Sequence, residues 1–302
     1  MTTGAVGLIG VGNMGSAMAR SLLAGGFEVV GHDVDAGRMA DLRRAGGSTA
    51  ATPAEVLRHS ERVVLSLPSA DALHAVVSGA GGLLEAARDG AVVAETSTLA
   101  LATKAAARDR LAAAGMTLLD CPISGTAGQA RARDIVFYAS GPEPAVRSFA
   151  PVLLAMGRAA PWLGAFGAGI KAKLVSNLLV AVHTMAAAEA LNLAEQADLD
   201  PATMLDVLAA GAGTSRMLEV RGPMMVARTY PSDSATVDIL AKDVELILGF
   251  AGDLDVPTPL LGMVASWFAA ARGQGRRGGD PAVLAEVYRS LSTRPPDAAG
   301  GS

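Results

Sequence analysis

Short apolar runs alternate with amphipathic stretches through the first half of the chain. Residues 5–9 are apolar and lead into a helical pattern after Gly15, and residues 28–32 lead into another near 38–45. Further apolar runs occupy 63–67, 91–94, 116–119 and 135–139, with helical patterns such as 99–114 between most of them. Because strands alternating with helices are typical of βαβ units, we predict an α/β fold with a doubly wound parallel sheet and helices on both faces.

Strand patterns end after about residue 164, and helical periodicity takes over. Residues 169–197 form one unusually long predicted helix, rich in Ala and Leu, and further helical patterns occupy 203–210, 235–251, 259–271 and 282–290. We therefore predict an α/β domain over 1–165, an all-helical substrate and dimerisation domain over 166–292 that begins with the long interdomain helix, and a disordered tail over 293–302. We expect the apolar surface of the long helix to be covered in a homodimer or homotetramer.

Composition narrows the class of protein. Hydrophobic residues make up 51% of the 302, enough for a large core, and the single cysteine excludes an intrachain disulfide. The N-terminus lacks the basic flank of a secretory signal, and the apolar stretches are interrupted before the roughly 20 residues that cross a bilayer. A net charge of −4 gives no general attraction to nucleic acid or anionic membranes. These features predict a cytoplasmic protein without a nucleic-acid or membrane partner.

A glycine motif lies between the first predicted strand and the first predicted helix. Gly10, Gly12 and Gly15 have the Gly-x-Gly-x-x-Gly spacing, and Asn13 and Met14 complete the loop. In this context the first glycine makes a tight turn, the second lets a pyrophosphate approach the backbone, and the third lets the helix pack against the strand. Free amides at the helix N-terminus then favour the anion. The first domain is therefore predicted to be a Rossmann-type dinucleotide-binding domain.

An acidic residue at the end of the second predicted strand bears on the choice of cofactor. Asp33 can accept hydrogen bonds from the ribose hydroxyls of NAD and would repel the 2′-phosphate of NADP. Val34 offers no guanidinium to that phosphate, although Arg38 lies about one helical turn further and could do so. We therefore expect NAD rather than NADP. The adenosyl part of S-adenosylmethionine, which also binds strand–glycine–helix loops, is the alternative ligand on this evidence.

Five motifs, in order along the chain, point to one enzyme family. The first is Gly7-Leu-Ile-Gly-Val-Gly-Asn-Met-Gly-Ser-Ala-Met-Ala-Arg-Ser-Leu22. The others are Leu67-Pro68-Ser69, Glu95-Thr-Ser-Thr98, Asp120-Cys-Pro-Ile-Ser-Gly125 and Gly167-Ala-Gly169-x-x-x-Lys173-x-x-x-Asn177, with a later Lys242-Asp243 pair. Together they resemble the β-hydroxyacid dehydrogenases, the family of 3-hydroxyisobutyrate dehydrogenase, tartronate semialdehyde reductase and 6-phosphogluconate dehydrogenase. The resemblance extends over nearly the whole chain.

The resemblance implies roles for several of these residues. Leu67 and Pro68 would belong to the cofactor loop, and Thr98 to the turn that faces the nicotinamide. Ser124 and Gly125 would bind the substrate carboxylate, for which a hydroxyl and bare backbone amides are suited.

Three departures from the family pattern fall around the expected substrate pocket. Thr126 stands where a glycine is common, Arg133-Asp134 replaces a Gly-Thr pair, and Ser176 replaces the first of two asparagines. Thr126 could add a hydroxyl to the pocket or narrow it, and the sequence does not choose between these. We therefore expect the departures to affect the substrate more than the reaction.

Lys173 and Asn177 are four residues apart on the long predicted helix, so their side chains project from the same face. A lysine held near a bound dinucleotide and screened from water can have its pKa lowered toward the working pH, and can then take a proton from a hydroxyl as hydride leaves the same carbon. The resemblance implies this acid/base role for Lys173, with Asn177 orienting the reacting oxygen. Lys171, about 200° round the helix, should be solvated.

The remaining candidates are weaker. Lys242 either approaches the cofactor or substrate from the helical domain or is only a helix-surface charge, and we include it among the binding residues; Asp243 is left as structural. The four histidines lack the spacing of metal ligands, so no metal is predicted. Cys121 has no adjacent base and is expected to be a buried structural thiol.

These observations predict an oxidoreductase that transfers a hydride between a nicotinamide cofactor and a small β-hydroxyacid. The hydroxyacid would resemble 3-hydroxyisobutyrate, glycerate or 4-hydroxybutyrate, and the product would be the semialdehyde or keto acid. One alternative is an imine or enamine reductase of the same architecture, which usually lacks the lysine at position 173. Another is a dinucleotide sensor without turnover, which the joint presence of Ser124, Lys173 and Asn177 disfavours.

Overall fold

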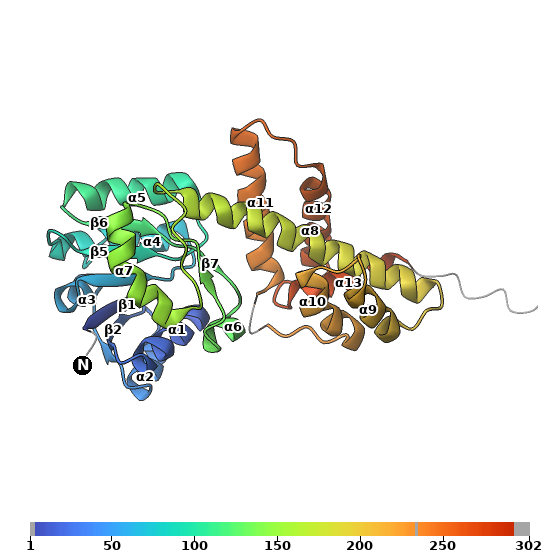
Figure 1. Ribbon diagram of the computed structural model, residues 1–302, viewed down its shortest axis with the longest axis horizontal. Helices are drawn as coiled ribbons and strands as arrows, with labels where there is room; N and C mark the ends of the chain where they lie inside the picture. Colours follow the sequence, from blue (N-terminus) through green and yellow to red (C-terminus); the bar gives the residue numbers. More distant parts are fainter. Residues whose placement is uncertain (1–3, 233–234, 293–302) are drawn as a thin grey trace, which may run out of the picture. The chain divides into compact units, whose positions relative to one another are not determined.

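The computed structural model describes residues 4–232 and 235–292 (Figure 1). The chain divides into two compact units, Met1–Lys173 and Leu174–Ser302, which we describe separately. The division falls inside one continuous helix, α8 (Ala168–Gln196), and therefore later in the chain than the boundary at residue 165 expected from the sequence. The predicted disordered tail, 293–302, lies outside the described residues.

The first unit is built on a parallel sheet with the strand order β3-β2-β1-β4-β5-β6. The strands are β1 (Ala5–Ile9), β2 (Glu28–His32), β3 (Ser48–Thr49), β4 (Arg62–Leu65), β5 (Val92–Glu95) and β6 (Thr117–Asp120). The order reverses at β1, whose neighbours are β2 and β4, and ligands of such sheets bind beyond the carboxyl ends of the strands at this point. The predicted doubly wound parallel sheet is confirmed.

One predicted strand does not belong to this sheet. Of residues 135–139, only Val136–Phe137 (β8) form a strand, and β8 pairs antiparallel with β7 (Ile123–Ser124) in a separate two-stranded sheet. An apolar run shows that a segment is buried, but it does not show which strand it pairs with, because the partner is set by register in space.

Helices cover both faces of the main sheet. They are α1 (Asn13–Ala24), α2 (Ala36–Arg44), α3 (Pro53–His59), α4 (Ala70–Ser78), the 3-10 turn η1 (Leu83–Ala86), α5 (Leu101–Ala113), α6 (Ala127–Arg131) and α7 (Glu143–Met156). Side chains fix several of their starts: the Thr52 hydroxyl accepts from the Glu55 amide at the start of α3, and the Ser69 hydroxyl accepts from the Ala72 amide at the start of α4.

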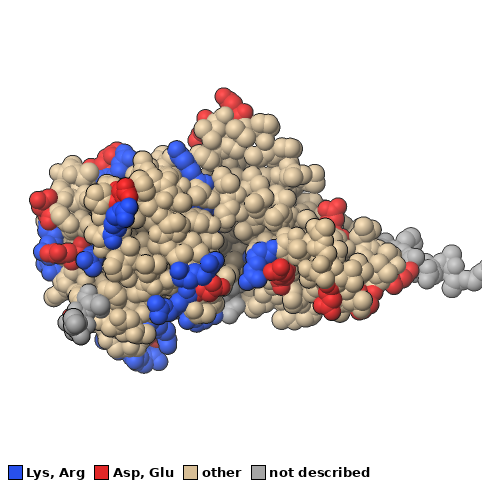
Figure 2. Space-filling view, viewed as in Figure 1, with Lys and Arg blue, Asp and Glu red and all other residues tan. Residues whose placement is uncertain are grey.

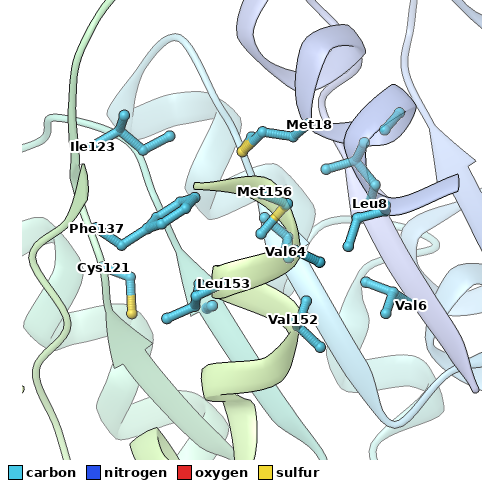
Figure 3. Close-up of a cluster of buried hydrophobic side chains, with 14 of the residues drawn as sticks. Val6, Leu8, Met18, Val64, Cys121, Ile123, Phe137, Val152, Leu153 and Met156 are labelled. Carbon is cyan, nitrogen blue, oxygen red and sulfur yellow. The ribbon is translucent and has the colours of Figure 1, made fainter. Parts of the chain in front are cut away.

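Two hydrophobic clusters, one on each side of the sheet, form the core of the first unit. In β4, Val64 belongs to one cluster while Val63 and Leu65 belong to the other, as the two-residue repeat of a strand requires. The first cluster is completed mainly by α1 and α7, as the packing of Met18 and Leu153 in Figure 3 shows. The second is completed by α3, α4 and α5. Burial on both faces explains why β1 and the central residues of β4, β5 and β6 are apolar on both sides of the sheet.

In the described residues of the second unit, 174–232 and 235–292, helices are the only regular secondary structure. It contains most of α8 and then α9 (Pro201–Ala210), α10 (Arg216–Ala227), α11 (Val237–Asp253), α12 (Pro259–Gly273), the 3-10 turn η2 (Pro281–Val283) and α13 (Leu284–Leu291). A buried ion pair lies in its core, where Arg221 Nε donates to Asp280 Oδ1 over 2.8 Å and Arg221 Nη1 donates to Thr184 Oγ1 over 2.9 Å. The predicted all-helical second half is confirmed.

Helix α8 is long and apolar enough to cross a membrane by length and composition alone, with a mean hydropathy of 1.5 in its most apolar window. This differs from the sequence-based expectation that every apolar stretch is interrupted before such a length. Core helices of soluble proteins pass the same test, and 44% of that window is buried inside the structure. One such helix among the described residues is weak evidence for a membrane span.

Candidate active site

The glycine loop joins β1 to α1, and the structure accounts for each glycine separately. Gly10 has φ +88°, and a Cβ atom on it would lie 2.1 Å from the Ser66 carbonyl oxygen. A Cβ atom on Gly15 would lie 2.0 Å from the Gly10 carbonyl oxygen. A Cβ atom on Gly12 would meet nothing within 4 Å, so the backbone there is open to an approaching group. Gly10 and Gly15 are thus required by packing, and Gly12 leaves room for a ligand.

The N-terminus of α1 offers hydrogen-bond donors to that open space. Gly12 precedes the helix and has no side chain to cap it, and α1 has no acidic residue in its first turn. The first amides of a helix need a partner from outside, and a phosphate can supply one. Asn13 and Met14 are the first two residues of α1 and so lie at this end of the helix.

Asp33, which follows β2, is held against the glycine loop. Its Oδ2 accepts from the Val11 amide over 2.6 Å, and its Oδ1 accepts from the Asp35 amide over 2.9 Å. A surface cavity of about 560 Å³ lies beside it and is lined by His32, Asp33, Val34, Ala36, Met39, Arg43, Thr49, Ala50, Ala51 and Glu55. Arg38 reaches back to the loop, where its Nη2 donates to Asn13 Oδ1 over 3.1 Å. The cavity lining therefore includes the Asp33 carboxylate, which could accept hydrogen bonds from ribose hydroxyls.

The loops after β4 and β5 are tied to each other at the same edge of the sheet. The Leu67 amide donates to Ser97 Oγ over 2.7 Å, and Thr96 Oγ1 donates to the Leu65 carbonyl over 2.7 Å. These bonds place the segments of Leu67, Pro68 and Thr98 at the carboxyl ends of neighbouring strands. The structure thus brings them to the edge at which the glycine loop lies.

The segment predicted to bind substrate runs from β7 into α6. Ser124 ends β7, and Gly125 follows with φ +138°. Thr126 caps α6: its Oγ1 accepts from the Gln129 amide, and Gln129 Oε1 accepts from the Thr126 amide. The sequence left open whether Thr126 adds a hydroxyl to the substrate pocket or narrows the pocket. In the structure this hydroxyl accepts a hydrogen bond that caps α6.

Helix α8 begins at the carboxyl end of β6 and is anchored there. The Gly169 amide donates to Ser140 Oγ over 2.9 Å, and the Ile170 amide donates to Asp120 Oδ2 over 2.7 Å. Gly167, the residue before the helix, has no side chain, so Asp120 and Ser140 provide the cap that the helix lacks. Lys173 lies about one turn beyond these anchored amides.

A buried lysine that the sequence analysis missed lies beneath this anchor. Lys104 of α5 is 0% exposed, and its Nζ lies 2.7 Å from both Glu95 Oε2 and Asp120 Oδ1. Burial alone would lower the pKa of Lys104, but the two carboxylates outweigh burial and raise the pKa. The signal was present in the sequence, because Lys104 shares the buried face of α5 with Ala107 and Leu111 at helical spacing.

Cys121, next to Asp120, is fully buried. Burial, and after it the charge of Asp120, raises the pKa of the Cys121 thiol well above its ordinary value. A thiol that keeps its proton is a poor nucleophile, in keeping with the structural role expected from the sequence.

In the second unit, Asn177 is fixed by a residue that sequence reasoning left as structural. Asn177 is 5% exposed, and its Nδ2 donates to Asp243 Oδ2 over 2.8 Å. The other oxygen, Asp243 Oδ1, lies 3.0 Å from Lys242 Nζ. Asp243 therefore holds two of the predicted site residues together. Because a carboxylate can only accept, the NH₂ group of Asn177 must face Asp243, which fixes the orientation of the Asn177 amide.

Helix α8 carries Lys173 and Asn177 one turn apart, as predicted. Lys173 is partly buried, whereas Lys171 is exposed. Among residues 4–232 and 235–292, no group of three or more His, Cys, Asp or Glu side chains is arranged to hold a metal ion.

Two family models match consecutive parts of the chain. The NAD-binding domain of 6-phosphogluconate dehydrogenase matches residues 5–164, and the NAD-binding domain of NADP-dependent 3-hydroxyisobutyrate dehydrogenase matches residues 167–288. The chain therefore belongs to the β-hydroxyacid dehydrogenase family, as its motifs predicted.

Relatives over the full length agree with this assignment. The chain is 34% identical over 287 residues to L-threonate dehydrogenase of Cupriavidus necator, covering 95% of this chain and 96% of the relative. It is 30% identical to mouse mitochondrial 3-hydroxyisobutyrate dehydrogenase, covering 86% of this chain and 79% of the relative. Such relatives make the protein a nicotinamide-dependent oxidoreductase of hydroxyacids, as predicted.

Solved structures show the same fold. A 3-hydroxyisobutyrate dehydrogenase from Salmonella typhimurium superposes with a TM-score of 0.85 at 31% identity, covering 94% of this chain and 99% of that one. An imine reductase from Streptomyces aurantiacus superposes with a TM-score of 0.64 at 24% identity, covering 96% and 100%. The second likeness shows the fold alone.

Proposed function

We propose that Lys173 is the acid/base of this dehydrogenase and that Asn177 orients the reacting oxygen. The observation that carries the proposal is the arrangement on α8: Lys173 follows amides anchored by Asp120 and Ser140, and Asn177, one turn later, is fixed by Asp243. In the oxidation, Lys173 Nζ accepts the proton of the substrate hydroxyl while a hydride leaves the carbon that bears this hydroxyl. In the reduction it returns that proton to the oxygen.

The nicotinamide cofactor supplies the hydride acceptor or donor. The residues of the first unit suit such a group: Gly12 leaves open space, α1 presents uncapped amides, and Asp33 is fixed beside the cavity. In this proposal Gly10, Gly12, Asn13, Met14 and Gly15 hold the pyrophosphate. The cofactor loops add Leu67, Pro68 and Thr98, and we include Lys242 among the residues proposed to bind the cofactor or substrate.

We infer a preference for NAD over NADP. The Asp33 carboxylate would repel a 2′-phosphate, and the Arg38 guanidinium, which could compensate, already donates to Asn13 Oδ1. Arg43 also lines the cavity, where its Nη1 donates to Thr49 Oγ1 over 3.0 Å. A kcat/KM for NADP equal to or above that for NAD would overturn the inference.

For the substrate we propose a small hydroxyacid whose carboxylate is bound by Ser124, Gly125 and Lys242, with Thr126 beside them. Several relatives are named L-threonate dehydrogenase, at 34% and 32% identity, so polyhydroxylated acids join 3-hydroxyisobutyrate, glycerate and 4-hydroxybutyrate in the first panel to test. A cyclic imine with NADPH belongs in the same panel. Turnover of the imine and none of the acids would favour the imine reductase reading instead.

The role of Lys173 is tested by Lys173→Met, with Lys171→Met as the matched control on the same helix. Loss of a general acid/base lowers kcat by about 10²–10⁴-fold, and we expect Lys173→Met in this range with an unchanged circular dichroism spectrum. Lys171→Met, which removes an exposed charge, should retain full turnover. Lys173→Met with turnover within twofold of the wild type would refute the proposal.

We also infer that the chain forms a homodimer or homotetramer in the cytoplasm. Helix α8 exposes Val175 and Leu193 by 63% and 68%, and α11 and α12 expose Ile239, Leu260 and Met263 by 49%, 60% and 59%. Charged side chains are sparse over α11 and α12 on the face seen in Figure 2. Apolar surface of this kind favours a subunit contact, and a monomer by light scattering would contradict the inference.

A further inference from the structure

Two carboxylates meet at the carboxyl ends of β5 and β6. Glu95 and Asp120 are paired residues in the register of these parallel strands, and both are 0% exposed. Like charges side by side in a low-dielectric interior repel strongly, so such a pair needs a cation. Lys104 Nζ lies 2.7 Å from an oxygen of each.

The single positive charge leaves one negative charge over, and backbone amides compensate for it. Glu95 Oε1 accepts from the Ser97 amide over 2.8 Å, and Asp120 Oδ2 accepts from the Ile170 amide over 2.7 Å. The Ile170 amide belongs to the N-terminus of a 29-residue helix, whose dipole favours a negative charge. The remaining negative charge of the cluster therefore lies at the N-terminus of α8.

Bonds from this cluster extend in two directions. On one side, Ser97 Oγ accepts from the Leu67 amide, which belongs to the cofactor loop after β4. On the other side, Asp120 and Ser140 hold the amides of Ile170 and Gly169. A continuous network, partly buried at the Leu67 amide and buried from Ser97 onward, therefore runs from the cofactor loop to the start of the helix that carries Lys173.

We propose that Lys104 is a positioning residue, which holds the turn over residues 95–98 and the N-terminus of α8 in a fixed relation so that Lys173 is aligned with the bound cofactor. This proposal rests on the acid/base role proposed for Lys173. Lysine suits the position because its compact ammonium meets two carboxylates at once on a flexible apolar stem. The chain has only four lysines, Lys104, Lys171, Lys173 and Lys242, and relies on arginine for its other cationic side chains.

Two variants separate positioning from a merely structural role. Lys104→Met removes the ammonium and leaves two carboxylates buried together, so we expect a lower Tm. The double variant Lys104→Met/Glu95→Gln removes one carboxylate as well, and should recover most of the lost Tm because a single buried charge then faces the α8 amides. If Lys104→Met does not fold, the double variant carries the test alone.

In the double variant, Asp120 has lost the ammonium that fixes it. We expect the Gly169 and Ile170 amides to exchange with deuterium at least tenfold faster than in the wild type, while amides of β1 and β4 keep their rates. We expect kcat to fall tenfold or more with both KM values within twofold. The primary isotope effect on kcat for substrate deuterated at the hydroxyl-bearing carbon should rise, because hydride transfer becomes slower relative to the other steps.

A double variant that recovers its Tm and keeps wild-type exchange, kcat and isotope effect would overturn the proposal. Lys171→Met is the control for loss of a lysine charge, and should change none of these quantities. The amide exchange needs neither substrate nor catalysis. It therefore decides whether Lys104 anchors α8 even if Lys173→Met remains active and the acid/base proposal fails.

Discussion

Gly169→Ala tests whether the close approach of α8 to the sheet is needed for catalysis. A Cβ atom at this position would lie 2.2 Å from the Tyr138 carbonyl oxygen and 2.7 Å from the Asp120 carbonyl oxygen. Ordinary contact begins near 3.4 Å, and both opposing atoms are backbone, so neither can rotate away. The first turn of α8 must therefore retreat by about 1 Å, and protein interiors do not absorb such a shift freely.

The magnitude follows from three contributions. Overpacking typically costs about 1–3 kcal/mol, and weakening the Ile170 amide bond to the Asp120 carboxylate costs about 1.5–3 kcal/mol. The better helix propensity of alanine returns about 1 kcal/mol. A net loss of about 1.5–5 kcal/mol should lower Tm by roughly 3–20 °C. A displacement of about 1 Å can reduce catalysis about 100-fold, and we expect kcat to fall by that order.

Calorimetry and steady-state kinetics with NAD measure both effects. Gly249→Ala is the matched control, because it lies on exposed α11 surface and an added Cβ would meet nothing within 4 Å. It should raise stability by up to about 1 kcal/mol through helix propensity. Wild-type Tm and kcat in Gly169→Ala would refute the reasoning.

Three further predictions concern other parts of the molecule. Arg221→Met leaves the buried Asp280 carboxylate without its cation. The free energy of unfolding, measured with urea, should fall by about 3–5 kcal/mol, and a loss below about 1 kcal/mol would contradict this. Asp33→Ala should raise the KM for NAD about tenfold or more and shift the ratio of kcat/KM values toward NADP; an unchanged ratio would show that Asp33 does not read the ribose. Stability should hold at neutral pH and decline above about pH 9, because folding raises the pKa of the Cys121 thiol and the Lys104 ammonium above their ordinary values of 9.0 and 10.5. The folded chain then keeps protons that the unfolded chain releases, so Tm measured against pH should fall on the alkaline side, and a Tm that is flat from pH 8 to 11 would contradict the assignment.

Much of the first unit follows from local pattern. The glycine loop, the strand before it and the helix after it are specified within residues 5–24, so periodicity and turn chemistry identify them. Strand β3, by contrast, has only two residues, too few to show a period. The β7 and β8 pairing joins segments whose partnership depends on their register in space.

The site shows the same division between local and distant information. Lys173 and Asn177 share a helix, and their spacing is visible in the sequence. Lys104 meets Glu95 and Asp120 only because parallel strands place those two residues side by side, and Asp243 meets Asn177 from another helix. Pattern along the chain could mark Lys104 as unusual on an alanine-rich helix, but it could not name its partners.

The first amides of α8 are capped by residues outside the helix, and this affects when the helix becomes stable during folding. A helix that begins after a glycine frays unless something outside it accepts its first amides, and here the acceptors are Asp120 at the end of β6 and Ser140 beyond it. The turn that leads to Lys173 therefore becomes stable only after the sheet has formed. If Lys173 is the acid/base, as we propose, a chain whose sheet is incomplete or damaged would lack an aligned acid/base. Catalytic activity would then report on the integrity of the nucleotide-binding sheet.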